Sequence, residues 1–292
     1  MPRGERIGDG ENIMYKKDMS PVLKWSGGKT QILWRIASYM PSDYCRYVEP
    51  FLGGGAVLLG FSPVQAFIND VNESLVNLYR QIKDAAETVI HNVNELDASP
   101  CNKELYYAIR DQYNQKITSG NYDAECAALM IWLNKHCFNG LYRVNRQGLF
   151  NVPFNGKIHG RSIDEENVRR ISRYLRHSDI QITCMDFERA CDVVRKGDFV
   201  YFDSPYVPES ITASFTYYNA GGFSLDDHKR LAALFRRLDK VGAKCMLSNN
   251  DVPLVRELYD GFLFQSFDAK RMINCKGDKR IGREVLITNY SF

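Results

Sequence analysis

Short apolar runs typical of buried strands alternate along this chain with longer segments of helical periodicity. The runs that predict strands are 46–51, 65–68, 180–184, 199–202, 244–247 and 284–288. Apolar residues spaced three and four apart predict helices over 31–39, 73–82, 225–238 and 252–259. Strands separated by helices are typical of a doubly wound, mostly parallel sheet, so we expect an α/β fold.

The alternation breaks between residues 85 and 179. Two helical patterns come first there, at 104–117 and 124–137. Apolar segments at 141–144 and 149–152 then flank a polar turn, as the arms of a β-hairpin do. We therefore predict that residues 85–179 form a helical insertion that carries a hairpin.

The chain is expected to divide into two domains and a tail. Residues 21–84 and 180–292 would form the α/β domain, and residues 85–179 the insertion. Residues 1–20 are polar and lack the apolar segment of a signal peptide, so we expect a disordered tail. No apolar run approaches the roughly 20 residues that span a bilayer. The eight cysteines form no C-x-x-C pair and no zinc pattern, so we expect a cytoplasmic protein without disulfides or a metal site. We also expect a monomer in solution.

Charge is nearly balanced, with 38 Lys and Arg against 35 Asp and Glu, but it is unevenly distributed. Residues 126–163 contain no acidic side chain, and residues 270–283 contain six basic residues and one acid. A charge cluster is usually a solvated face, but two in a near-neutral chain favour a surface for a polyanion. In the second stretch we expect Lys279 and Arg280 to contact phosphates.

A triple-glycine turn follows the first predicted strand. Phe51 and Leu52 precede three glycines that begin at Gly53, and Asp70 ends the next predicted strand 17 residues later. Glycines allow a sharp turn and a close approach of the backbone to a ligand, and a carboxylate at this place can accept hydrogen bonds from ribose hydroxyls. The spacing does not match a phosphate-binding P-loop. A tight structural turn explains the glycines alone; glycines and acid together favour an adenosine-containing ligand.

The run from Phe199 to Tyr206 places an acid directly after an apolar strand. Asp203 would lie at the carboxyl edge of the sheet, where open α/β folds bind ligands. A carboxylate, a backbone carbonyl and the Tyr206 ring together suit an extruded base, whose exocyclic amine needs two acceptors and whose ring needs a stacking partner. The structural alternative is a strand-end cap and an aromatic at the rim.

The segment from Lys24 to Lys29 precedes the first predicted helix. Trp25 beside two glycines in a polar stretch is unusual for a core residue. Lys29 can offer its charge to a carboxylate ligand, or it is a solvated lysine at a helix start.

Taken in order, these motifs resemble the Dam-type DNA adenine methyltransferases from about Pro21 to Tyr290. The matching segments are 24–29, 48–55, 69–70, 138–145, 150–154, 185–187, 203–206 and 288–290. The resemblance implies a Rossmann-like methyltransferase sheet with a DNA-recognition insertion. It also implies S-adenosylmethionine as methyl donor, double-stranded DNA as partner, and methylation of adenine, expected in G-A-T-C sites.

The resemblance also implies roles for individual residues. The cofactor would contact Trp25, Gly27, Lys29, Phe51, Gly53, Asp70, Asp186, Phe187 and Asp203. Asp70 would bind the ribose, and Asp186 and Phe187 would border the cofactor's adenine. The flipped target adenine would be held by Asp203, Ser204, Pro205 and Tyr206.

The hairpin after Phe138 resembles the element that enters the major groove of DNA in this family. It would bring to the bases Asn139, Leu141, Arg143, Asn145 and Pro153. Arginine pairs bidentately with guanine, and Leu or Pro can contact a thymine methyl group. Lys24 resembles a lysine that contacts the first guanine.

Ser204 departs from the family pattern, which usually has two prolines after the catalytic acid. Ser204 keeps the backbone carbonyl that this position contributes, but it lacks the fixed φ of proline, so the loop is less preorganised. A weakened or inactive DNA-binding relative therefore stays open as an alternative. A second alternative is an adenine methyltransferase that acts on RNA, which would keep the cofactor half but need not carry this hairpin.

Overall fold

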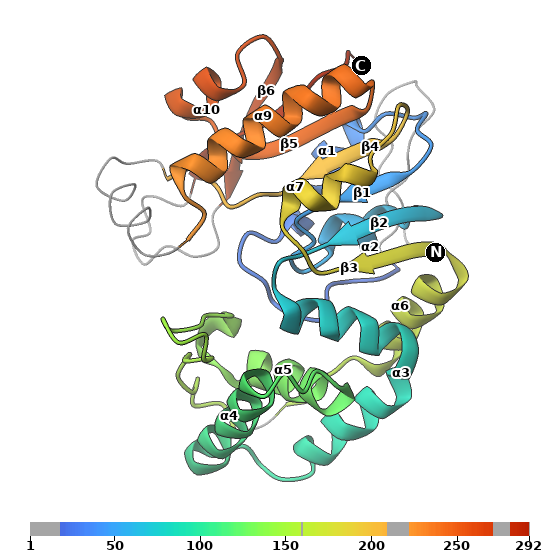
Figure 1. The fold of residues 1–292 in the computed structure, drawn as a ribbon. Helices are drawn as coiled ribbons and strands as arrows, with labels where there is room; N and C mark the ends of the chain where they lie inside the picture. Colours follow the sequence, from blue (N-terminus) through green and yellow to red (C-terminus); the bar gives the residue numbers. More distant parts are fainter. Residues whose placement is uncertain (1–17, 159, 209–221, 271–280, 292) are drawn as a thin grey trace.

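The computed structural model describes residues 18–158, 160–208, 222–270 and 281–291 of the 292-residue chain. Within these ranges the chain forms a seven-stranded sheet of order β3-β2-β1-β4-β5-β7-β6, with helices on both faces (Figure 1). A helical insertion lies beyond the β3 edge of the sheet. This is the α/β fold with an inserted helical unit that the alternation of strands and helices predicts.

Five strands of the sheet run parallel: β1 (Tyr47–Glu49), β2 (Gln65–Asn69), β3 (Asp179–Thr183), β4 (Phe199–Phe202) and β5 (Lys244–Asn250). β7 (Ile281–Thr288) is antiparallel to both β5 and the edge strand β6 (Leu263–Lys270). The chain builds outward from β1 in one direction and from β4 in the other. The carboxyl ends of these two strands therefore mark the switch point at which open α/β sheets bind ligands.

All six predicted strands are present, and β6 is the strand that the sequence reading missed. Its eight residues mix apolar and polar side chains, because an edge strand needs only one buried face. Phe267 and Ala269 provide that face. β5 also continues past the predicted end at Leu247 to Asn250.

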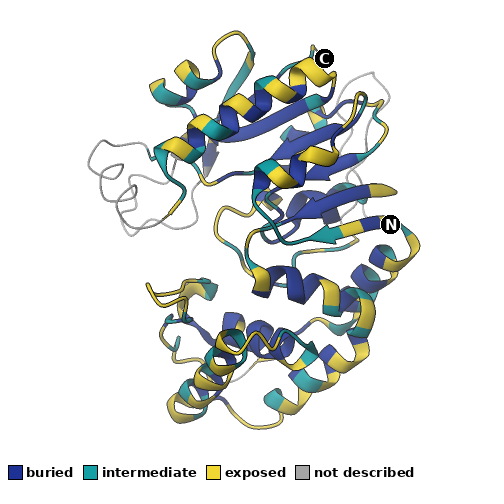
Figure 2. Cartoon of the chain, viewed as in Figure 1, coloured by how far each residue is buried: buried dark blue, intermediate teal, exposed yellow. Residues whose placement is uncertain are grey.

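The two faces of the sheet pack against different helices. Phe199 and Tyr201 of β4 belong to a core shared with α1 (Leu33–Tyr39), α2 (Ala56–Phe61) and the insertion. Val200 and Phe202, which alternate with them, belong to a second core. The helices of that second core are α7 (Phe187–Ala190), α9 (Leu225–Val241) and α10 (Pro253–Leu258). Figure 2 accordingly shows the central strands largely in dark blue, with yellow residues on the outward faces of the helices that flank them.

The insertion contains the second half of α3 (Glu73–Asp97), together with α4 (Lys103–Thr118), α5 (Ala124–His136) and α6 (Glu165–His177). α3 starts after β2 and kinks at Ala85, where φ is −140° and ψ is 37°. The sequence reading missed α6, although Val168, Ile171 and Leu175 are buried at helical spacing and Asp164 caps its first turn. The buried side chains of the insertion are continuous with one sheet-face core, so the insertion has no separate core of its own.

The predicted hairpin forms with little regular strand. Its arms pair through two isolated antiparallel bridges, Val144 with Phe150 and Cys137 with Phe154. The Asn145 side chain accepts hydrogen bonds from the backbone N–H groups of residues 147 and 149, at 2.9 and 3.0 Å, and so closes the turn. Residues 138–154 are called the hairpin below.

Most of the predicted tail, residues 1–17, lies outside the described ranges. Ser20 joins the fold, because its backbone exchanges hydrogen bonds of 3.0 and 2.9 Å with the Asn167 side chain. Among the described helices, none combines the length and apolar character that a membrane crossing needs.

The continuous core predicts a single cooperative unfolding transition. Leu129 of α5 is 1% exposed within this core, so Leu129→Ala should lower the free energy of unfolding by about 2–5 kcal/mol. Val64 is 75% exposed, and Val64→Ala should change the value by less than about 0.5 kcal/mol. Urea titrations followed by circular dichroism measure both. Two separate transitions, of which Leu129→Ala shifts only one, would contradict the prediction.

Candidate active site

An ion pair lies at the carboxyl end of β4. The Lys29 ammonium is 2.6 Å from Oδ1 of Asp203, and the same oxygen accepts a 3.1 Å hydrogen bond from the Ser248 hydroxyl. Ser248 lies at the end of β5, and its hydroxyl is also within 3.1 Å of the buried Tyr201 hydroxyl. Two separate segments of the chain, those of Lys29 and Ser248, therefore hold the Asp203 carboxylate.

Lys29 is 4% exposed and begins a short 3₁₀ helix, Lys29–Gln31. Its ammonium donates a 2.6 Å hydrogen bond to the Gly27 carbonyl and lies 4.6 Å from the centroid of the Tyr206 ring. Burial by itself lowers the pKa of Lys29, but Asp203, with smaller contributions from Tyr201 and Glu284, raises the pKa above its ordinary value overall. Lys29 is therefore a buried cation and not a solvated lysine at a helix start.

Burial raises the pKa of Asp203, and the Lys29 ammonium and the Ser248 hydroxyl oppose that rise. A buried carboxylate stays ionised at low cost only where a cation and hydrogen-bond donors surround it. The geometry thus places a negative charge at the end of β4, with the positive charge of Lys29 beside it as compensation.

The three residues after Asp203 differ in exposure. Ser204 is 2% exposed and its hydroxyl has no hydrogen-bond partner within the described chain, whereas Pro205 is exposed. The Tyr206 hydroxyl donates a 3.1 Å hydrogen bond to Glu284 of β7.

The backbone at Val207 is fixed from β5. Its N–H donates to the Asn249 side chain at 2.9 Å, and its carbonyl accepts from the Asn250 side chain at 2.6 Å. These two amides restrain the loop after Asp203, in which Ser204 lacks the rigid ring of a proline. The sequence reading ended this strand at Leu247 and so missed Ser248, Asn249 and Asn250. The available signal was a polar triplet directly after an apolar strand.

The glycine turn after β1 is closed by Asp70. Oδ2 of Asp70 accepts a 2.9 Å hydrogen bond from the Gly53 N–H, and Oδ1 accepts one of the same length from Asn72. Gly53 has a φ of +50° and Gly55 a φ of +68°, conformations that favour glycine. The carboxylate keeps free lone pairs for further donors, since each oxygen can accept two hydrogen bonds.

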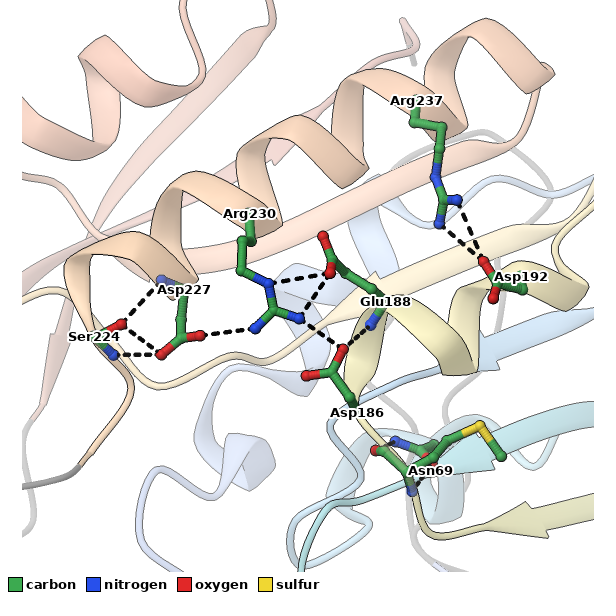
Figure 3. Close-up of polar contacts among 9 residues, drawn as sticks. Asn69, Asp186, Glu188, Asp192, Ser224, Asp227, Arg230 and Arg237 are labelled. Carbon is green, nitrogen blue, oxygen red and sulfur yellow. Dashed lines mark hydrogen bonds and ion pairs between the residues drawn. The ribbon is translucent and has the colours of Figure 1, made fainter.

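Phe51 and Phe187 lie next to the glycine turn with their rings 5.3 Å apart and inclined by 29°. Asp186 caps α7 by accepting a 3.0 Å hydrogen bond from the Glu188 N–H, and it accepts a 2.9 Å hydrogen bond from Arg230 of α9 (Figure 3). Arg230 also binds Glu188 and Asp227. The Asp186–Phe187 segment is thus fixed against α9.

Asn69, at the end of β2, joins two of these segments. Its side-chain nitrogen donates to the backbone carbonyls of Pro50 and Met185, at 3.0 and 2.9 Å. Figure 3 shows Asn69 below the Asp186 segment. The structure therefore brings the predicted cofactor residues to one edge of the sheet. Trp25 belongs to the same group, because a Cβ atom placed on Gly53 would lie only 3.2 Å from its ring.

The predicted DNA-contacting residues lie on or beside the hairpin. Asn139, Arg143, Asn145, Pro153 and Lys24 are exposed, and Leu141 is half-buried. Asn139 adopts a left-handed backbone, with φ at +56°. The Arg143 guanidinium donates a 2.8 Å hydrogen bond to Asn151 within the hairpin.

Phe138 was not among the residues expected at the DNA. Phe138 is 53% exposed at the start of the hairpin and adds an apolar side chain to this surface. Lys279 and Arg280 fall outside the described residues, as does most of the second basic stretch. Across the described ranges, no group of three His, Cys, Asp or Glu side chains is arranged to hold a metal ion.

Comparison with known proteins agrees with this arrangement. Residues 25–273 match the family described as D12 class N6 adenine-specific DNA methyltransferase. The Type II methyltransferase M.MjaIII of Methanocaldococcus jannaschii is 42% identical, covering 94% of this chain and 100% of its own length. M1.LlaDCHI of Lactococcus lactis subsp. cremoris, also a Type II methyltransferase, is 40% identical over 96% of this chain and 99% of its own.

A third relative is described as a DNA adenine methylase and not as a Type II methyltransferase. The DNA adenine methylase of Haemophilus influenzae is 31% identical, covering 95% of this chain and 96% of its own length. The family match spans both the sheet and the insertion, and it confirms the resemblance read from the motifs. The chain belongs to the D12 class of N6 adenine-specific DNA methyltransferases.

Proposed function

We propose that this adenine-specific DNA methyltransferase transfers a methyl group from S-adenosylmethionine to a flipped-out adenine in duplex DNA, within G-A-T-C sites. The observation that carries the proposal is the Asp203 carboxylate at the end of β4 with the Tyr206 ring beside it. Both lie next to Lys29, whose ammonium is 2.6 Å from Asp203 and 4.6 Å from the Tyr206 ring centroid.

The residues around the glycine turn suit S-adenosylmethionine, which supplies an electrophilic methyl group when bound. Asp70 has lone pairs left for ribose hydroxyls, and the positive φ angles at Gly53 and Gly55 bring the backbone close to a ligand. Phe51 and Phe187 offer apolar ring faces for the adenine moiety, and Asp186 is fixed beside them. Trp25 and Gly27 would border the same site. Lys29 would attract the carboxylate of the cofactor.

The target amine is a poor nucleophile because its lone pair is delocalised into the purine ring. Hydrogen bonds from the amine to Asp203 and to the Ser204 carbonyl would draw the lone pair toward the incoming methyl group, while Tyr206 stacks on the ring. A carbon–nitrogen bond forms as the carbon–sulfur bond breaks. The nitrogen then loses one proton, to Asp203 or to water. The negative charge of Asp203 favours the positive charge that develops on nitrogen.

The loop geometry favours an active enzyme over an inactive DNA-binding relative. Position 204 contributes a backbone carbonyl, and the backbone three residues later is clamped by Asn249 and Asn250. Those contacts supply the preorganisation that a second proline would otherwise give. Pro205 retains its fixed φ. Since the family acts on DNA, an RNA substrate has no independent support.

The insertion, residues 85–179, is proposed as the target-recognition domain, with the sheet as the catalytic domain. Arg143 and Lys24 would contact guanines, and Leu141 and Pro153 thymine methyl groups. Asn139 would add a base contact. Asn145 already closes the turn through its own side chain, so its contribution at DNA would be to shape the hairpin.

The central test replaces Asp203 with the isosteric amide. Asp203→Ala would remove both the charge and the hydrogen-bond acceptor beside the buried Lys29 ammonium and so destabilise the fold. Asp203→Asn, which keeps an oxygen acceptor there, is the sharper variant. We expect kcat to fall by about 10²-fold or more, because the negative charge beside the target amine is lost. Transfer of tritium from labelled cofactor to a G-A-T-C duplex measures it.

Asp198 is the matched control for this experiment. It is 4% exposed, lies just before the other end of β4, and pairs with Arg46 at 2.8 Å. Asp198→Asn therefore removes a buried ionic partner far from the site, and it should lower stability but leave kcat within about twofold of wild type. Full activity in Asp203→Asn would refute the catalytic role of Asp203.

The target sequence can be tested through Arg143. Arg143→Ala should lower kcat/KM on G-A-T-C duplexes by about 10- to 100-fold, since a bidentate arginine–guanine contact is worth about 1–3 kcal/mol. Its discrimination against duplexes with a substituted guanine should shrink correspondingly. Arg173, exposed on α6, is the control, and Arg173→Ala should preserve both values. Unchanged discrimination in Arg143→Ala would exclude this contact.

A further inference from the structure

Trp25 connects the proposed cofactor site with the hairpin. Its ring stacks on Tyr142, with the centroids 5.1 Å apart and the planes inclined by 24°. The same residue packs against the glycine turn, where a Cβ atom added to Gly54 would lie 3.0 Å from Trp25 Cβ. One side chain therefore contacts both the backbone that would meet the cofactor and an aromatic residue of the DNA-facing hairpin.

Asn134 of α5 fixes the same junction through the backbone. Its side-chain nitrogen donates to the carbonyls of Lys24 and Gly140, at 3.0 and 2.9 Å, and its oxygen accepts from the Lys24 N–H at 2.9 Å. Asn134 is 7% exposed, and its two N–H donors and its oxygen are all used. The residue before Trp25 is thereby tied to the first turn of the hairpin.

The packing at this junction is close. Gly140 has a φ of +64°, and a Cβ atom there would lie 2.8 Å from Cδ of Lys24. A side chain at position 140 would therefore push Lys24 away from the hairpin. Lys24 and Trp25 cannot move relative to residue 140 without disrupting these contacts.

Tyr142 is anchored in the insertion on its other sides. Its hydroxyl lies 3.2 Å from that of Tyr113, and its ring centroid is 5.7 Å from that of Phe150. The next residue, Arg143, is exposed. A displacement of the hairpin on DNA would thus carry Tyr142 with it, and Tyr142 would transmit that displacement to Trp25.

We propose that Tyr142 is a positioning residue that couples DNA recognition to cofactor binding through its stack on Trp25. The inference rests on the proposed function, because it requires S-adenosylmethionine at the glycine turn and DNA at the hairpin. DNA that fixes the hairpin also fixes Trp25, so the cofactor then orders less of the protein when it binds. By linkage, the cofactor strengthens DNA binding by the same factor.

The test uses the full chain and S-adenosylhomocysteine, which cannot turn over. Its Kd is measured by calorimetry with and without a saturating G-A-T-C duplex, and the ratio is the coupling factor. Wild type should show a factor of about 5 or more. Tyr142→Leu should reduce it to nearly 1, whereas Tyr142→Phe, which keeps the ring, should retain it. If Tyr142→Leu does not fold, Tyr142→Met tests the same loss of the aromatic plane.

Tyr107 is the matched control. It is a half-buried tyrosine of α4 whose ring packs edge-on against Tyr106 at 5.3 Å, within the same insertion. Tyr107→Leu should keep the wild-type factor. The proposal is overturned if wild type shows no coupling, if the Tyr142 variant without a ring keeps it, or if Tyr107→Leu loses it equally. Failure of wild type to bind either ligand would instead overturn the proposed function, and this inference with it.

Discussion

The buried pair of Lys29 and Asp203 is the interaction on which the site depends. Both groups are largely removed from water, and they come from segments 174 positions apart in the chain (203 minus 29). Separation would leave a charge in a poorly solvated place, so the N-terminal segment is held against the end of β4. Trp25, Gly27 and Lys24 lie on that segment. The pair thus helps to hold them at the glycine turn and the hairpin, together with the contacts of Asn134 and Tyr142.

Much of the fold could be predicted from local pattern. β4 is wholly apolar because both its faces are buried, and this made it the clearest strand in the sequence. The sequence reading missed β6 and α6, because each mixes apolar and polar positions in its local pattern. β6 is an edge strand with one buried face, and α6 has few apolar positions among many charges. Each is stabilised mainly by neighbours that the local sequence does not reveal.

The site was predictable where a residue's own neighbours signal its role, as with Asp203 after an apolar strand and the glycines after β1. Contacts between segments that are distant in the sequence could not be predicted. Nothing near Lys29 in the sequence indicates that its ammonium is buried against Asp203, nor that Asn134 binds the backbone of Lys24. Such contacts arise from packing of the insertion and the N-terminal segment against the sheet, and only the folded arrangement reveals them.

The amides of Asn249 and Asn250 have a consequence for how this family varies. They restrain the backbone at Val207 from the neighbouring strand. The loop therefore does not depend on a proline at position 204, directly after Asp203, to fix its conformation. What constrains the side chain at position 204 is then mainly its burial, since Ser204 is 2% exposed. Related chains should tolerate other compact residues there as long as the two asparagines persist. A search that insists on consecutive prolines would pass over such enzymes.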